Sequence, residues 1–284
     1  MPIKKLLQKY HLRPNKRLGQ NFLISQRALQ KIIQTAKLSK KDTVLEIGPG
    51  LGVLTHALAK RAKKVIAVEK DKRIVEILRD ELGNYKNVEI IHGDILKLFR
   101  SKRHALFATS LLKKGCSKKG VPLDGYKIVA NIPYYLTSFL IRLFLESKNP
   151  PQEMVLLVQK EVAQRICAKP PKMNLLAISV QFYGQPKIIS YVSKKSFWPQ
   201  PKVDSAIIKI GKIQKPKNIN IKSFFQVVKA GFSSPRKQLA NNLSQKLNLP
   251  REEIKEALAQ CGLQRQARAA NLSINDWINL SRLL

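Results

Sequence analysis

From Thr43 onward the chain alternates short apolar runs with amphipathic stretches, and the spacing of the apolar positions predicts strands and helices. Short apolar runs bounded by polar or turn-forming residues are typical of buried strands. They are Thr43–Ile47, Val65–Val68, Val88–Ile91, Tyr126–Ala130, Met154–Val158, Lys187–Val192 and Val203–Ile210. The stretches between them with helical periodicity are Val53–Arg61, Asp71–Leu82, Leu136–Glu146, Lys160–Cys167 and Asn174–Phe182. This alternation predicts an α/β fold with a doubly wound, mainly parallel sheet covered on both faces.

The pattern changes after Gly211. A polar, proline-containing linker, Lys212–Asn220, is followed by segments that all have helical periodicity. These segments are Ile221–Ala230, Pro235–Leu247, Arg251–Gln260 and Ile274–Leu283. Pro250 before the third segment and Gly262 after it are typical helix boundaries. We therefore expect two domains, an α/β domain over residues 1–212 and a small C-terminal all-helical domain over residues 219–284.

Positive charge dominates the composition. The 284 residues include 53 Lys and Arg against 18 Asp and Glu, a formal net charge of +35. Residues 38–96 hold 9 acids and 11 bases, whereas residues 97–127 and 182–222 each hold 9 bases and 1 acid. A nearly neutral block beside strongly basic segments predicts a ligand-binding core with a cationic rim that attracts polyanions. Nucleic acid is the expected partner, and a generally lysine-rich surface is the alternative.

One basic segment does not fit the alternating scheme. Lys97–Gly125 separates two predicted strands and contains the Lys- and Gly-rich stretch Lys113–Gly120. Two interpretations stay open here: a disordered or half-ordered insertion, and a loop that grips RNA.

Membrane and metal-dependent classes are disfavoured. No stretch free of Lys, Arg, Asp and Glu exceeds 14 residues, the length of Ile128–Ile141, whereas a membrane span needs about 20 apolar residues. The 3 cysteines and 4 histidines are scattered, so the sequence indicates neither a zinc site nor a disulfide framework. We expect a soluble, cytoplasmic protein with free thiols, no metal and no membrane partner.

A glycine-rich loop follows the first predicted strand, with the sequence Glu46-Ile47-Gly48-Pro49-Gly50-Leu51-Gly52. Its glycines allow a tight turn and a close approach of the backbone to a ligand at the carboxyl edge of the sheet. Glu69 ends the next strand, where it can accept both ribose hydroxyls of an adenosine-containing cofactor. Asp94 follows the third strand, placed to meet the adenine amino group. The loop lacks a basic residue for a pyrophosphate and the G-x-G-x-x-G spacing of an NAD site, so the three acids favour S-adenosylmethionine, which is cationic at sulfur.

A second motif, Asn131-Ile132-Pro133-Tyr134-Tyr135, follows the strand Tyr126–Ala130. Pro133 holds Ile132 extended and leaves carbonyl oxygens free at the sheet edge. Together with the side-chain oxygen of Asn131, these acceptors suit the exocyclic amino group of a planar base. By accepting its protons they make the nitrogen nucleophilic toward a sulfonium methyl.

Two aromatic residues are candidates for holding that base. Tyr134 would stack on a base extruded from its helix, since a paired base cannot reach a buried methyl donor. Phe197 lies in a rigid, proline-containing loop before the last predicted strand and would press on the other face of the base. Ordinary core packing is the alternative for Phe197.

These motifs occur in the order seen in ribosomal RNA adenine dimethyltransferases, and the chain resembles that family over nearly its whole length. The matching segments are Lys16–Leu23, Glu46–Gly52, Asn131–Tyr134, Gln159–Ala163, Phe197–Ser205, Arg236-Lys237 and Arg268–Ser273. It most resembles the housekeeping type, which dimethylates N6 of two adjacent adenines in the 3′-terminal hairpin of small-subunit (16S) rRNA during ribosome biogenesis. The resemblance implies a doubly wound Rossmann-like methyltransferase sheet with a small helical domain.

The resemblance also implies roles for single residues. The cofactor-binding set that it implies is Asn21, Leu23, Glu46, Gly48, Gly50, Glu69, Asp94 and Asn131. Asn21 and Leu23 close over the cofactor, and Glu46 faces the methionine ammonium. As a hypothesis, we extend the family's RNA binding to Lys16, Arg17, Arg236, Lys237, Arg265 and Arg268. The helical domain is implied to dock a monomeric enzyme on the small-subunit pre-ribosomal particle, although Pro235 replaces an arginine that is frequent in the family.

Two other functions compete with this one. The first is a sister enzyme that methylates an adenine of large-subunit rRNA and confers antibiotic resistance; Lys16–Leu23 and Arg268–Ser273 favour the housekeeping type instead. The second is a non-catalytic RNA-binding assembly factor with the same fold. The acids Glu69 and Asp94 together with Asn131 argue against lost catalysis. An NAD dehydrogenase is disfavoured by the glycine spacing.

Overall fold

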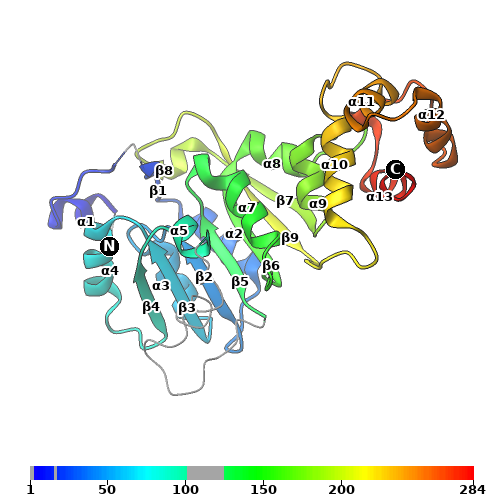
Figure 1. Ribbon diagram of the computed structural model, residues 1–284. Helices are drawn as coiled ribbons and strands as arrows, with labels where there is room; N and C mark the ends of the chain where they lie inside the picture. Colours follow the sequence, from blue (N-terminus) through cyan, green and yellow to red (C-terminus); the bar gives the residue numbers. More distant parts are fainter. Residues whose placement is uncertain (1–2, 16–17, 101–124) are drawn as a thin grey trace. The chain divides into compact units, whose positions relative to one another are not determined.

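The computed structural model describes residues 3–15, 18–100 and 125–284 (Figure 1). The predictions for Lys16, Arg17 and most of Lys97–Gly125 lie outside these residues. By their contacts the described residues form two compact units. The first comprises residues 1–163 and 187–213, and the second comprises residues 164–186 and 214–284. No helix in the described part of the chain is long and apolar enough to cross a membrane.

A seven-stranded sheet organises the first unit, in the order β4-β3-β2-β5-β6-β9-β7 (Figure 1). Its strands are β2 (Thr43–Ile47), β3 (Lys64–Glu69), β4 (Val88–His92), β5 (Lys127–Asn131), β6 (Glu153–Gln159), β7 (Gln185–Val192) and β9 (Ser205–Gly211). Strands β4, β3, β2, β5 and β6 pair in parallel, and β9 is antiparallel to β6. The predicted doubly wound, mainly parallel sheet is confirmed, with each predicted strand within two residues of an observed one.

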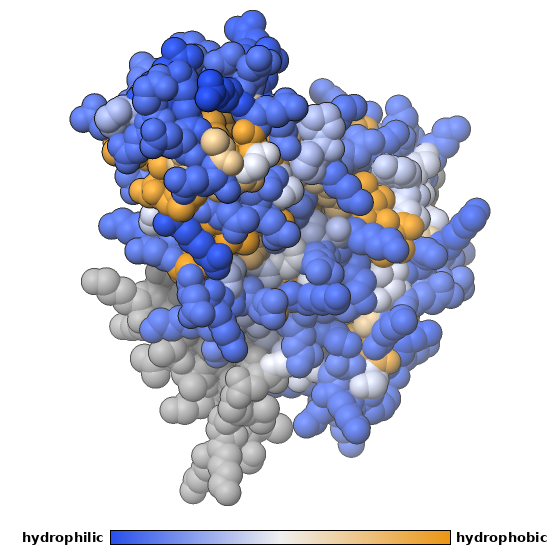
Figure 2. Space-filling model, turned by 90° about the vertical axis from the view of Figure 1, so that its right-hand side faces the viewer, coloured by the Kyte–Doolittle hydropathy of each residue, from blue (hydrophilic) through white to orange (hydrophobic). Residues whose placement is uncertain are grey.

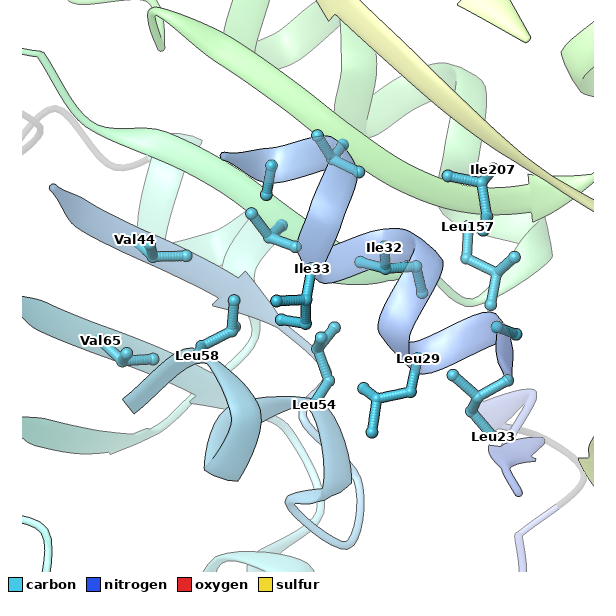
Figure 3. Packing of buried hydrophobic residues seen from close by; sticks show 14 of the residues in the cluster. Leu23, Leu29, Ile32, Ile33, Val44, Leu54, Leu58, Val65, Leu157 and Ile207 are labelled. Carbon is cyan, nitrogen blue, oxygen red and sulfur yellow. The ribbon is translucent and has the colours of Figure 1, made fainter. Parts of the chain in front are cut away.

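The sheet is covered on both faces, which explains why its strands are nearly continuous apolar runs. One face packs against α2 (Gln26–Ala36) and α3 (Val53–Ala59), with Leu29, Ile32 and Leu58 reaching the strands (Figure 3). The strand residues that alternate with this face are also buried: Leu45, Ile66, Ile128, Leu156 and Ile208. The other described helices of the first unit are α1 (Ile3–Lys9), α4 (Lys72–Leu82), α5 (Ile95–Arg100), η2 (Tyr134–Leu136), α7 (Thr137–Leu145), the start of α8 (Lys160–Ile166) and η3 (Lys194–Ser196).

The first 40 residues contain elements that the periodicity analysis did not predict. Helix α1 (Ile3–Lys9) packs through Leu6 and Leu7 in one apolar cluster with α4, and Lys9 Nζ lies 2.8 Å from Glu81 Oε1. Helix α2 begins where Ser25 Oγ accepts the Ala28 N–H. Between them, the two-residue strand β1 (Phe22–Leu23) pairs with β8 (Phe197–Trp198). These contacts fix the N-terminal segment on the first unit.

The second unit is helical. It contains the end of α8, α9 (Leu175–Gln181), α10 (Ile221–Gly231), α11 (Leu239–Leu247), α12 (Arg251–Gln260), η4 (Ala269–Asn271) and α13 (Ile274–Leu283). Phe182 stacks on Phe224 with ring centroids 4.1 Å apart, and the Met173 N–H donates to the Ala270 carbonyl. These contacts place residues 164–186 with the C-terminal helices. The second unit therefore includes a segment that the expected boundary near residue 212 assigns to the α/β domain. Whether residues 219–284 fold as a domain stays a prediction.

Candidate active site

A pocket lies where β2, β3, β4 and β5 end, because parallel strands present their carboxyl ends at the same edge of a sheet. Its wall combines the loops after these strands with the segment Leu18–Leu23, which runs across it. The predicted site residues that line this pocket are Asn21, Leu23, Glu46, Gly48, Gly50, Glu69, Asp94, Asn131, Pro133 and Tyr134. Residues from four strand ends and an N-terminal segment therefore converge on one cavity.

The glycine-rich loop has the backbone that its sequence requires. Gly48, Gly50 and Gly52 have φ values of 65°, 55° and 79°, in the left-handed region that side chains disfavour. A Cβ on Gly50 would also lie only 3.1 Å from the ring of Phe22. The loop can thus pass close to the segment Leu18–Leu23, called the covering segment below, and lead directly into α3.

Glu46 is a buried carboxyl at the floor of the pocket. It is 1% exposed, and its Oε2 has no hydrogen-bond partner within the described residues. Burial raises the pKa of Glu46 to about 8, the Thr55 hydroxyl opposes this shift, and the nearby charge of Glu69 adds to it. A buried polar atom without a partner is costly, so this carboxyl is suited to a cationic or hydrogen-bond-donating ligand group.

Glu69 is held at the end of β3 by backbone donors. Its Oε1 accepts the N–H groups of Lys70 (2.8 Å) and Asp71 (2.9 Å), and its Oε2 accepts the Gly50 N–H (3.3 Å). Burial raises the pKa of Glu69, although these hydrogen bonds oppose the shift. The carboxyl group is thereby oriented beside the glycine-rich loop before any ligand arrives.

Asp94 follows β4 and is paired with a cation. Its Oδ2 lies 2.9 Å from Lys70 Nζ, and its Oδ1 accepts the Leu96 N–H at 2.9 Å. Burial acts against ionisation, but Lys70 and the backbone donor outweigh it and lower the pKa of Asp94. Lys70 is the only basic residue among the described residues that line the pocket. The acids and glycines therefore fit S-adenosylmethionine, which carries no phosphate.

Asn131 ends β5 and contacts the covering segment. Its Nδ2 donates to the Asn21 carbonyl at 3.2 Å. Because a carbonyl oxygen can only accept, this contact fixes the orientation of the amide and leaves Oδ1 as the acceptor of Asn131. Among the carbonyl groups after β5, that of Pro133 accepts the Leu136 N–H at 3.0 Å in η2.

The two aromatic candidates differ in position. Tyr134 is half-buried at the pocket, its hydroxyl lies 2.7 Å from Ser205 Oγ, and burial raises its pKa. Phe197 is 2% exposed, faces Leu23 across the β1–β8 pair and packs in the core cluster. It does not line the pocket, so the geometry agrees with core packing, and base stacking by Phe197 stays a prediction.

Four of the six predicted RNA-binding residues lie in the second unit. Arg236 and Lys237 are exposed between α10 and α11, and Arg265 and Arg268 are exposed between α12 and α13. None of the four forms an ion pair with a described acid.

Sequence reasoning missed the residues that position the predicted ones. They are Gln20, whose Nε2 donates to Asp71 Oδ2 at 3.1 Å, Lys70 beside Asp94, and Ser205 beside Tyr134. Lys70 follows Glu69 directly, which was the available signal. Gln20 and Ser205 lie within the matching segments Lys16–Leu23 and Phe197–Ser205, but their spacing gives no information on their partners.

Comparison with known proteins agrees with this geometry. Residues 11–284 match the family model of the ribosomal RNA adenine dimethylases. A ribosomal RNA small subunit methyltransferase A of Dehalococcoides mccartyi is 43% identical over 279 residues, covering 98% of this chain and 90% of the relative. The protein of the same name from Clostridium botulinum is 40% identical over 286 residues, covering 99% of this chain and 98% of the relative.

Solved structures have the same fold. The crystal structure of the 23S rRNA methyltransferase ErmE has a TM-score of 0.72 at 26% identity and covers 93% of this chain and 99% of its own. A dimethyladenosine transferase from Plasmodium falciparum has a TM-score of 0.71 at 28% identity, covering 91% and 95%. The sheet topology, the acid-lined pocket and Asn131 at its edge thus occur in a chain that belongs to the ribosomal RNA adenine dimethylase family.

Proposed function

We propose that this chain transfers methyl groups from S-adenosylmethionine to N6 of two adjacent adenines in the 3′-terminal hairpin of small-subunit rRNA, giving N6,N6-dimethyladenosine. One observation carries the proposal: Asn131 presents a fixed side-chain acceptor to the same pocket that holds the acids Glu46, Glu69 and Asp94. An acceptor for an amino group beside a site for a cationic adenosine cofactor suits adenine N-methylation.

Each acid of the pocket would bind a different part of the cofactor. Glu69 would accept the ribose hydroxyls, Asp94 the adenine amino group, and Glu46 would face the methionine ammonium. Bound S-adenosylmethionine supplies a methyl group on an electrophilic sulfonium. The glycine-rich loop lets the backbone approach this ligand, and the segment Leu18–Leu23 excludes water from above.

Asn131 and Tyr134 would act on the target base. Asn131 Oδ1 would accept a hydrogen bond from the N6 amino group and so turn the nitrogen lone pair toward the methyl donor. As the N6–C bond forms and the S–C bond breaks, the N6 proton would leave to solvent. The ring of Tyr134 would support the extruded base by stacking. Because the sulfonium is a strong electrophile, positioning contributes more than a general base would.

The small subunit is the preferred substrate because of the similarity to named relatives. The proteins at 40% and 43% identity are named for the small subunit, whereas the large-subunit enzyme ErmE is 26% identical. A pre-ribosomal particle as the substrate, a monomeric state and a cytoplasmic location are part of the same proposal.

The function can be tested with unmethylated small- and large-subunit particles as separate substrates. We expect dimethyladenosine in the small subunit alone, detected by nucleoside mass spectrometry and mapped to the 3′-terminal hairpin. Product in the large subunit would make the chain a resistance-type enzyme. Cofactor binding without product in either particle would indicate a non-catalytic assembly factor.

Glu46 predicts a pH-dependent cofactor affinity. The raised pKa of about 8 keeps its carboxyl protonated in the free protein at pH 7, so binding of an ammonium group should favour the carboxylate and release a proton. The affinity for S-adenosylmethionine should then rise from pH 6 to pH 8, by up to about tenfold per pH unit. Titration calorimetry in buffers of different ionisation heat measures the proton release. Glu46→Gln should release no proton; a wild-type titration without proton release would contradict the assignment.

The four exposed basic residues of the second unit predict a particle-docking surface. Alanine at Arg236, Lys237, Arg265 and Arg268 should weaken binding to small-subunit particles and reduce the slope of log affinity against log salt by about 3. Affinity for S-adenosylmethionine should be unchanged. The matched control removes four other exposed charges of this unit, Lys215, Lys217, Lys222 and Lys229. Equal particle binding by both variants would refute this surface.

Hydrophilic residues cover most of the face shown in Figure 2, which agrees with a chain that has 53 Lys and Arg. Charge alone therefore does not distinguish an RNA-binding site from the rest of the surface.

A further inference from the structure

An exposed tyrosine with a cation on its ring lies outside the methylation pocket. Tyr191, near the end of β7, is 55% exposed. Lys160 Nζ lies 5.2 Å from the centroid of its ring. An aromatic ring open to solvent and flanked by a cation is the arrangement on which proteins stack unpaired bases.

Lys160, the cation at this ring, is linked by hydrogen bonds of Asp204 and Ser205 to Tyr134 in the motif Asn131–Tyr135. The Asp204 carbonyl accepts the Lys160 N–H at 3.0 Å, and Asp204 Oδ1 accepts the Lys194 N–H at 2.9 Å. The next residue, Ser205, is bonded to the Tyr134 hydroxyl. Two consecutive residues therefore bond to the first residue of α8, to the 3-10 helix η3 (Lys194–Ser196) that follows β7, and to Tyr134 of the pocket.

A groove beside Tyr191 is lined by basic and small polar residues. Its described lining, from α2, β7 and the chain after β7, is Ser25, Arg27, Ala28, Gln30, Lys31, Gln34, Ile189, Ser190, Tyr191, Val192, Ser193 and Ser196. No acid occurs among these residues. Exposed Lys195 lies in the same chain segment as Ser193 and Ser196.

Two cations, Arg27 and Lys31, line this groove. Two more lie beside it, Lys160 at the ring of Tyr191 and Lys195 between the lining residues Ser193 and Ser196. Arg27, Lys31, Lys160 and Lys195 form no ion pair with an acid of the described residues, and all four are exposed. Other lysines of the same unit do: Lys64 with Glu89, Lys127 with Asp42 and Lys209 with Glu153. The groove therefore retains a local positive charge that suits a chain of phosphates.

We propose that this groove binds the single-stranded RNA segment that flanks the methylated adenines. A base stacks on Tyr191, and Arg27, Lys31, Lys160 and Lys195 contact the phosphates. The inference rests on the proposed function, because that function supplies the RNA. Single-stranded RNA fits better than a duplex, since only an unpaired base exposes its face to an aromatic side chain.

Tyr191→Ala tests the stacking. The affinity for a fluorescent single-stranded RNA oligonucleotide should fall about tenfold, and the KM for unmethylated small-subunit particles should rise about tenfold. Tyr191→Phe, which keeps the ring, should match the wild type in both measurements. Because Tyr191 is exposed, both variants should keep the melting temperature of the wild type. The affinity for S-adenosylmethionine should be the same in all three proteins.

Lys160→Ala/Lys195→Ala tests the phosphate contacts. The slope of log affinity against log salt for the oligonucleotide should fall by about 1.4, or about 0.7 for each phosphate that the variant no longer neutralises. The matched control, Lys40→Ala/Lys86→Ala, removes the same charge from two exposed residues outside the groove. They precede β2 and β4 and so lie at the amino ends of these strands. It should keep the wild-type slope.

The outcomes separate this inference from the proposed function. Absence of methyl transfer by the wild type refutes the proposed function, whereas the oligonucleotide measurements still test the groove. Wild-type binding by Tyr191→Ala, or equal salt slopes in the two lysine variants, overturns the groove. A defect on protein-containing particles with unchanged oligonucleotide binding also overturns it, and would indicate a protein partner.

Discussion

Replacing Asn131 by alanine is expected to lower methyl transfer by about 100- to 1000-fold, because the variant loses the acceptor that orients the N6 amino group. The substitution also removes the hydrogen bond from Nδ2 to the Asn21 carbonyl. One such bond contributes about 0.5–1.5 kcal/mol, so the affinity for S-adenosylmethionine should fall no more than about tenfold. Single-turnover transfer to small-subunit particles and calorimetric cofactor binding measure the two effects separately.

The control for this variant is Asn84→Ala, which removes an exposed asparagine between α4 and β4. It should transfer methyl groups at the wild-type rate. If Asn131→Ala lost cofactor binding and transfer in equal measure, the residue would serve mainly to hold the covering segment rather than the base.

The second large effect is expected at Glu69. Glu69→Ala removes the acceptor of the ribose hydroxyls, and hydrogen bonds to a charged group contribute about 1.5–3 kcal/mol each. Two such bonds correspond to a loss of S-adenosylmethionine affinity of about 100-fold or more. The substitution also leaves the N–H groups of Gly50, Lys70 and Asp71 without their acceptor. Glu69→Gln keeps part of these contacts and should show a smaller loss.

Glu76→Ala is the matched control, because it removes an exposed carboxylate from α4 only a few residues away. Its cofactor affinity should equal that of the wild type. Unchanged affinity in both Glu69 variants, with normal melting temperatures, would show that the ribose is held by another residue.

The sheet was predictable because its signals are local. The predicted strand Thr43–Ile47 coincides with β2, since an apolar run there ends at a glycine with positive φ. Strands β1 and β8 were not predicted, because two residues show no periodicity and only their mutual pairing makes them strands. Residues 164–186 were assigned to the sheet domain by their place in the sequence, whereas Phe182 packs on Phe224, 42 residues later.

The site was predictable in its chemistry but not in its contacts. Glu46, Glu69 and Asp94 follow successive strands, and topology brings them to one edge without any long-range information. The contact between Asn131 and Asn21 spans 110 residues, and that between Tyr134 and Ser205 spans 71. Their partners could not be derived from spacing. Phe197 illustrates the same limit, since its burial depends on the pairing of β8 with β1.

The contact between Phe22 and Gly50 has a consequence for sequence variation among relatives. The ring of Phe22 occupies the space that a Cβ at position 50 would need, and Gly50 also requires its positive φ. The two positions therefore constrain each other unequally. A smaller residue at position 22 would still leave position 50 restricted to glycine by its positive φ, whereas a larger residue at position 50 would displace Phe22. Across an alignment, position 50 should therefore remain glycine even where position 22 varies.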